Sequence, residues 1–194
     1  MKKIKFTQHD FNETKMLAES IMKTDLIDSD YVITTSDEIF KIQPFFHSAL
    51  LGHQHDVTME EFEEIMKIYF LVWEFFKSHP NLQIKQVTES CFNKTQKKNI
   101  EMLRYSQDEP KEKDKQEIYS SDLQNLKSKS LMAAIFFRFK ERPTLLNMDI
   151  EKKGAIMIGI KSFIECFDDL TKQSTNAQSG RRPVSRKPTG ASFG

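Results

Sequence analysis

Apolar residues recur at the three- to four-residue spacing of amphipathic helices in six stretches of the chain. The first stretch begins near Asp10, a candidate cap, and the second at residues 35–38, which have the spacing of a capping box. Pro44 either kinks the second helix or opens a new one at its first position. Gly52 is expected to end that segment in a left-handed turn.

The third stretch predicts a helix over residues 58–78 at the centre of the fold. It begins with a capping box at Thr58, and its second half is apolar nearly all round. The fifth stretch, residues 123–141, contains the run 131–137 without a polar face, so it is expected in the interior as well. We expect these two helices to pack against each other and against the last one. The alternative is that one of them is buried against a partner.

The fourth and sixth stretches predict helices over residues 90–105 and 149–172. In the sixth, Gly154 and Gly159 are expected to permit close contact with a neighbouring helix. A solvated linker is expected over residues 106–117, where eight of the twelve residues are charged.

Two connecting segments are candidates for short strands, namely residues 24–34, read as a loop with a possible strand, and residues 81–87. The six glycines and six prolines are too few for the many turns of a sandwich or barrel. About six helices with short connections therefore predict an all-α bundle in one domain, residues 1–173.

Composition adds a large aromatic core and a cellular setting to this prediction. Sixteen phenylalanines supply buried area, and nine methionines fill the gaps between them. No apolar stretch approaches the ~20 residues that span a bilayer, and the start MKKIKF lacks the apolar segment of a secretory signal. Cys91 and Cys166 lie on separate predicted helices and would be bridged only by chance proximity. A reduced, cytoplasmic protein is therefore expected.

The composition changes at the end of the chain, over residues 174–194. This tail holds no acidic residue and four cations, so the remainder of a chain of net charge +1 carries 1 − 4 = −3. The residues expected to bind a partner there are Arg181, Arg182, Arg186, Lys187 and Phe193.

Four interpretations of the tail stay open. It is a disordered terminus, a cationic arm for an acidic protein or nucleic acid, a peptide that docks in a partner through Val184 and Phe193, or a kinase substrate at Ser185 with Arg182 three residues before it. Burial in the core is not among them, because the segment is too polar and proline-rich to pack there.

A basic stripe on the fourth helix is the second candidate for binding. Its residues, on the face opposite Phe92 and Leu103, are Lys94, Lys97, Lys98 and Arg104. Such a stripe can meet phosphates, but Glu101 interrupts it and a charged outer face is what any surface helix needs.

The best metal-like group is formed by His47, His53, His55 and Asp56. Two imidazoles and a carboxylate can ligate zinc if a further ligand arrives. The alternative is a polar turn between Gly52 and the Thr58 cap, and it is preferred because neither cysteine is adjacent in sequence. We therefore predict no metal and no cofactor.

Other catalytic patterns are missing from the sequence. The aspartates of residues 25–30 lack the spacing of a calcium loop, and Glu60 to Glu64 lie at a helix N-terminus without the Glu-x-x-His pairs of a di-iron bundle. Apolar or acidic neighbours of both cysteines raise a thiol pKa. The chain also has no glycine-rich phosphate loop, nucleophile elbow or His-Glu-x-x-His helix.

The sequence thus predicts a non-enzymatic interaction or assembly protein, whose bundle binds a partner and whose tail runs along a partner protein or acidic polymer. The first alternative is a nucleic-acid-binding protein that uses the tail and the 94–104 helix face. The second is a metal-dependent enzyme at the histidines. Partner identity and oligomeric state do not follow from the sequence.

Overall fold

The computed structural model describes residues 8–178 except 110, 112, 115–120 and 123. Within these residues the chain forms nine α-helices, one 3₁₀ turn and no strand, so the fold is all-α as predicted. In chain order they are α1 (Gln8–Asp25), α2 (Ser29–Ile42), α3 (Pro44–Gly52), η1 (His53–His55), α4 (Met59–Phe76), α5 (Pro80–Ile84), α6 (Glu89–Asp108), α8 (Lys129–Glu141), α9 (Pro143–Leu146) and α10 (Ile150–Gln178).

The central helix is α4, which contacts α1, α3, α8, α9 and α10. Its start is the predicted capping box: the Thr58 hydroxyl accepts from Glu61 N, and the Glu61 carboxylate accepts from Thr58 N. Ten residues of α4 are buried, among them Trp73 at 0 % exposure. The expected packing of the helix over residues 58–78 against the later two long helices is therefore confirmed.

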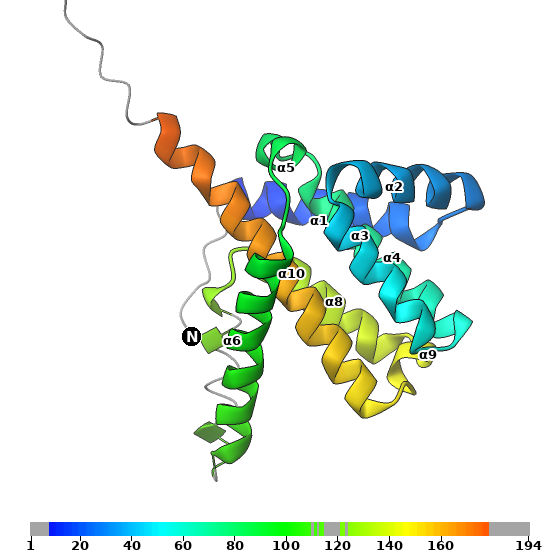
Figure 1. Ribbon diagram of the computed structural model, residues 1–194, viewed down its shortest axis with the longest axis vertical. Coiled ribbons are helices and arrows are strands. Elements are labelled where there is room, and N and C mark those ends of the chain that lie inside the picture. The colour runs from blue at the N-terminus through cyan, green and yellow to red at the C-terminus, as the bar shows by residue number, and fades with distance from the viewer. Residues whose placement is uncertain (1–7, 110, 112, 115–120, 123, 179–194) are drawn as a thin grey trace, which may run out of the picture.

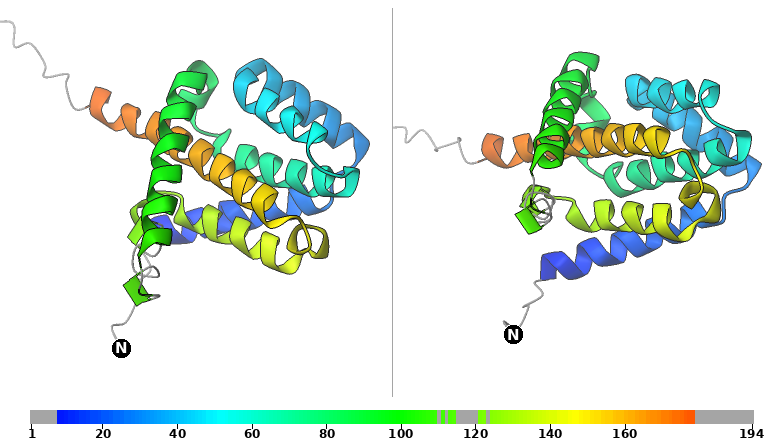
Figure 2. Two further views of the ribbon diagram at one scale, coloured as in Figure 1. Left: turned by 60° about the horizontal axis from the view of Figure 1, so that its bottom comes forward. Right: turned by 90° about the horizontal axis from the view of Figure 1, so that it is seen from below.

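The arrangement of the long helices sets the shape of the molecule. Helices α1, α4, α8 and α10 run roughly alongside one another, with α2 and α3 at one end (Figures 1 and 2). Helix α6 instead crosses α10 at a steep angle and makes its main contact with it (Figure 2). A crossing helix covers only part of its neighbour, so the flanks of α10 away from the crossing depend on other elements for cover.

A cluster of aromatic rings forms the core where α3, α4, α6 and α10 meet. Phe163 of α10 lies 4.2 Å from Phe92, 4.8 Å from Phe46 and 6.2 Å from Tyr69, measured between ring centroids. Phe163 is completely buried. Edge-on and tilted rings at such separations favour one another beyond the area they bury.

The second helix begins earlier than the sequence predicts. Asp28 is its N-cap and accepts a hydrogen bond from Tyr31 N (2.8 Å), so α2 covers most of the segment 24–34 that was expected to be a loop or strand. The capping-box spacing at residues 35–38 is not used, because Thr35 lies buried inside the helix. Burial of this apolar face outweighs the weak helix propensity of the β-branched residues there.

Three glycines do not have the roles that the sequence suggested. Gly52 has φ −56° and ψ −33°, so the chain continues into η1 instead of ending in a left-handed turn. A Cβ atom added at Gly154 or Gly159 would meet nothing within 4 Å, so neither glycine mediates a close helix contact. Pro44 is the first residue of α3, as one of the two alternatives held.

Residues 81–87 form no strand, because their polar backbone groups find other partners. Residues up to Ile84 belong to α5, and the extended chain after it is bonded to one buried side chain, Gln43. The Gln43 amide donates to Leu82 O (2.9 Å) and Lys85 O (2.8 Å), and its oxygen accepts from Val87 N (2.9 Å).

The predicted helix 123–141 is shorter than expected. Helix α8 starts at Lys129, because Ser128 directs its backbone N–H and hydroxyl to Asp168 of α10 at 3.1 and 2.7 Å. The apolar run 131–137 is buried only on one face, and Phe137 on the other face is 63 % exposed. The expectation that this whole run lies in the interior was therefore wrong.

The limits of the last two long helices also differ from the prediction. Residues 106–108 of the expected linker continue α6, and α10 extends past Lys172 to Gln178. No helix in the described part of the chain is long and apolar enough to cross a membrane.

Candidate functional site

Among the described residues, an open apolar groove lies between α6, α8 and α10, on the flank of α10 beside the steep crossing. It consists of two adjoining hollows of 330 and 480 Å³, which share Leu103, Gly154 and Ile158. We call them together the α6–α10 groove. Its lining residues are Gln96, Asn99, Ile100, Met102, Leu103, Asp122, Met132, Phe136, Ile150, Glu151, Gly154, Ala155, Met157, Ile158 and Lys161.

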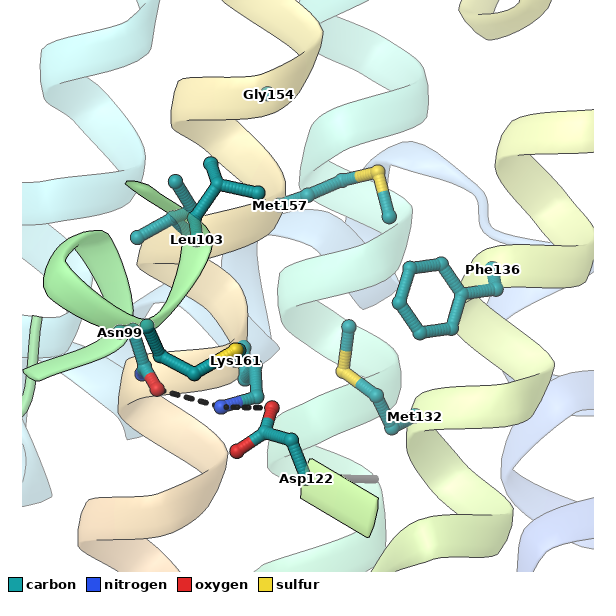
Figure 3. A pocket seen from close by; sticks show the side chains of 10 residues that line it. Asn99, Leu103, Asp122, Met132, Phe136, Gly154, Met157 and Lys161 are labelled. Carbon is teal, nitrogen blue, oxygen red and sulfur yellow. Dashed lines mark hydrogen bonds and ion pairs between the residues drawn. The ribbon is translucent and has the colours of Figure 1, made fainter. Parts of the chain in front are cut away.

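The apolar walls of the groove come from three helices. Leu103 of α6, Met157 of α10, and Met132 and Phe136 of α8 surround the first hollow (Figure 3). Ile150, at the start of α10, lines the second hollow and is 75 % exposed. On each of these helices the apolar residues have the helical spacing of a core face. Another helix covers only part of each apolar face.

A closed ionic group forms one end of the first hollow. Lys161 is buried, and its ammonium donates to Asn99 Oδ1 (2.5 Å) and Asp122 Oδ2 (3.0 Å) (Figure 3). It also donates to Glu165 Oε1 (2.6 Å). Three acceptors use all three N–H groups of a lysine. The ammonium therefore anchors the wall and has no donor left for a ligand.

Gly154 is the position at which the groove is most open to substitution. It lies in both hollows, and a side chain added there would point into empty space. A helix-interior glycine carries a cost of about 1 kcal/mol relative to alanine. A larger side chain at this position would fill the groove without disturbing the core.

The basic stripe predicted on the fourth helix lies on α6 with its side chains exposed. At about 100° per residue, Lys97 and Arg104 border one edge of the groove face and Lys98 borders the other, whereas Lys94 lies on the far side. Two of these charges face carboxylates: Lys97 lies 4.0 Å from Glu101, and Lys98 lies 3.6 Å from Glu165. The stripe is therefore partly neutralised at the groove edge itself, at Lys97 and Lys98.

The structure does not gather the histidine group into a site. His53 Nε2 lies 3.0 Å from the buried Tyr69 hydroxyl, and His47 packs edge-on against Phe40. Burial lowers the pKa of both His47 and His53, while His55 and Asp56 are exposed. Within the described ranges, no three histidine, cysteine or acidic side chains are close enough together to hold a metal ion.

The two cysteines are closer together than the sequence suggested. Cys91 of α6 and Cys166 of α10 have their Sγ atoms 3.7 Å apart. Burial raises the pKa of the Cys166 thiol to about 12, in agreement with its apolar and acidic neighbours. No sequence signal predicts this proximity, because it depends on how α6 crosses α10.

The predicted tail residues Arg181, Arg182, Arg186, Lys187 and Phe193 lie outside the described residues. The sequence did not predict the groove, because the apolar stripes were expected mainly in the core and burial against a partner was only the alternative for one helix. The only signal of an exposed wall was the run 131–137, which is too apolar for a helix with one solvent-facing side.

Comparison with protein-family models, with curated proteins and with solved structures finds no match for this chain.

Proposed function

We propose that this protein is a non-enzymatic interaction protein whose α6–α10 groove binds an amphipathic helix of a partner protein. The observation that carries the proposal is the apolar groove itself, which joins two hollows along α10 and is open among the described residues. Apolar surface left open to water favours binding, and a groove of this kind suits the apolar face of a helix.

The composition of the walls supports a helical occupant. Met102, Met132 and Met157 come from three different helices and line the first hollow. Methionine is flexible and polarizable, and it is over-represented on surfaces that accept varied helices. Two hollows that meet at Leu103 suit apolar side chains three or four residues apart on the occupant.

The charges at the edge define the rest of the partner. Lys97 and Arg104 border the groove on α6. A partner helix with acidic residues beside its apolar face would meet them, and Arg104 can bind a carboxylate through two parallel hydrogen bonds. The electrostatic part of this recognition is expected to weaken with added salt.

A substitution that fills the groove tests the proposal. Peptides selected from a displayed helical library on the wild-type protein should show apolar residues at i, i+3 or i+4, and i+7, flanked by acids. Gly154→Leu should weaken their binding at least tenfold, because the leucine occupies the space that both hollows share. Isothermal titration calorimetry measures this loss.

Two matched variants separate groove filling from helix stabilisation. Gly154→Ala and Gly159→Ala each relieve a helix glycine and should raise stability by about 0.5–1 kcal/mol, and peptide binding should stay within about threefold of wild type. If all selected peptides bind the Gly154→Leu variant as tightly as they bind wild type, the groove is not the binding site.

We further propose that the tail adds a salt-dependent contribution through acidic segments of the partner. Neutralising Arg181, Arg182, Arg186 and Lys187 should weaken binding of polyglutamate and flatten its salt dependence. Phe193→Ala should weaken the binding only of a partner that also offers an apolar pocket. Fluorescence anisotropy over a range of salt concentrations measures both effects.

The matched control neutralises the α6 cations Lys94, Lys97, Lys98 and Arg104. Polyglutamate binding that is unchanged by loss of the tail cations would refute this role of the tail. A thymidine oligonucleotide that binds more tightly than polyglutamate, with a salt slope reduced by about 0.7 per neutralised cation, would favour nucleic acid as the partner instead.

A further inference from the structure

The two cysteine sulfurs lie in contact where α6 crosses α10. Cys91 Sγ on α6 and Cys166 Sγ on α10 are 3.7 Å apart. A disulfide bond is about 2.05 Å long, so the sulfurs need to approach by less than about 2 Å. Cys91 is exposed and Cys166 is buried, which leaves one sulfur accessible and the other protected.

The surroundings hold both sulfurs in place. Cys91 lies in the first turn of α6, where its backbone N–H donates to the Thr88 capping hydroxyl (3.2 Å). The Cys166 thiol donates to Thr95 Oγ1 (3.6 Å), one turn further along α6. Phe92 and Phe163 pack 4.2 Å apart beside them and fix the separation of the two helices.

We propose that Cys91 and Cys166 form a reversible dithiol–disulfide site that exchanges with small-molecule disulfides such as oxidised glutathione. The site does not depend on the α6–α10 groove or on the tail. It is a modification site in the first turn of α6, and its oxidised form links α6 covalently to α10.

The exchange takes two steps. The Cys91 thiolate attacks one sulfur of oxidised glutathione, forms a mixed disulfide and releases one glutathione thiolate. Cys166 then loses its proton, attacks Cys91 Sγ and expels the second glutathione thiolate, and each thiolate is protonated. The two cysteines are thereby oxidised by two electrons, and one oxidised glutathione is reduced to two glutathione molecules.

Exposure decides which sulfur reacts first. Oxidised glutathione reaches Cys91 at the surface, whereas burial shields Cys166 and raises its pKa to about 12. Cys166 therefore reacts only with a sulfur already beside it. This order favours the intramolecular bond over glutathionylation of Cys166.

The experiment treats the full chain with oxidised glutathione and follows the free thiols and the intact mass. We expect the wild-type protein to lose both thiols together and two hydrogen atoms, while staying monomeric on a non-reducing gel. A bond between residues 75 positions apart should raise the melting temperature by about 5–15 °C. Dithiothreitol should reverse every change.

Two variants make the result decisive. Cys91→Ser removes only the exposed sulfur, so its Cys166 should remain a free thiol under the same treatment. Cys166→Ala should stop at a glutathione adduct on Cys91. If the wild-type protein also stops at that adduct, forms disulfide-linked dimers or keeps both thiols, the proposal is wrong.

Discussion

Replacing Phe163 with alanine is expected to lower the free energy of unfolding by about 3–5 kcal/mol, the largest effect of any single substitution considered. The ring is completely buried and contacts rings of α3, α4 and α6. Its removal leaves a cavity among groups held by three separate helices, and such a cavity closes poorly. Urea denaturation followed by the fluorescence of Trp73 measures the loss.

The control is a phenylalanine of the same chain that lies at the surface. Phe137→Ala, at a side chain that is 63 % exposed, should change the free energy of unfolding by less than about 1 kcal/mol. Equal losses from the two substitutions would contradict the aromatic core at the α6–α10 crossing.

The second large effect is expected at Glu74, whose carboxylate joins three helices. Its side chain is 3 % exposed; Oε1 lies 2.7 Å from Lys77 Nζ, and Oε2 lies 3.2 Å from Lys23 Nζ of α1. The Tyr31 hydroxyl of α2 also donates to Oε1 at 3.1 Å. Glu74→Gln should destabilise the protein by about 2 kcal/mol, because Lys23 loses its charge partner, Lys77 keeps only Glu38, and the tyrosine loses a charged acceptor.

The same carboxylate predicts a dependence of stability on pH. Burial opposes ionisation of Glu74, but the hydrogen bonds and charges of Lys77 and Lys23 outweigh it, so its pKa lies below the ordinary 4.5. A lowered pKa means that this stabilisation is present above pH 4.5 and is lost as the pH falls below that value. The difference in unfolding free energy between wild type and Glu74→Gln should therefore narrow on acidification.

Denaturation of both proteins at several pH values checks this prediction, with Glu101→Gln as the control. Glu101 is 63 % exposed and lies 4.0 Å from Lys97, so its substitution should cost less than about 1 kcal/mol at any pH. A difference that stays constant down to low pH would show that folding does not lower the pKa of Glu74.

The helices that were predicted accurately carry their own signals. The Thr58 capping box and the apolar run behind it predicted α4 closely, and both the cap and the burial are present. The first turns of helix α2, before Thr35, were missed because the β-branched residues there favour a strand locally. Its helical form depends on burying Thr35 and Ile39 against other helices.

The α6–α10 groove could not be predicted from the helical periodicity of apolar residues. Leu103, Phe136 and Ile158 lie on stripes that predict a core, and periodicity says which face of a helix is apolar but not what covers it. The crossing of α6 over α10 determines which apolar residues are covered. It buries Phe92 and leaves Leu103 at the edge of an open hollow.

The sequence by itself determined that this protein is an all-α bundle with a central helix at α4, because capping and helical periodicity act within a few residues. It also determined the basic composition of the tail, which is a matter of residue type alone. Only the tertiary structure decided that an apolar groove stays open, that Cys91 meets Cys166, and that Lys161 meets Asp122. These contacts join residues 39 or more positions apart, and they follow from the angles at which rigid helices pack, which local sequence does not specify.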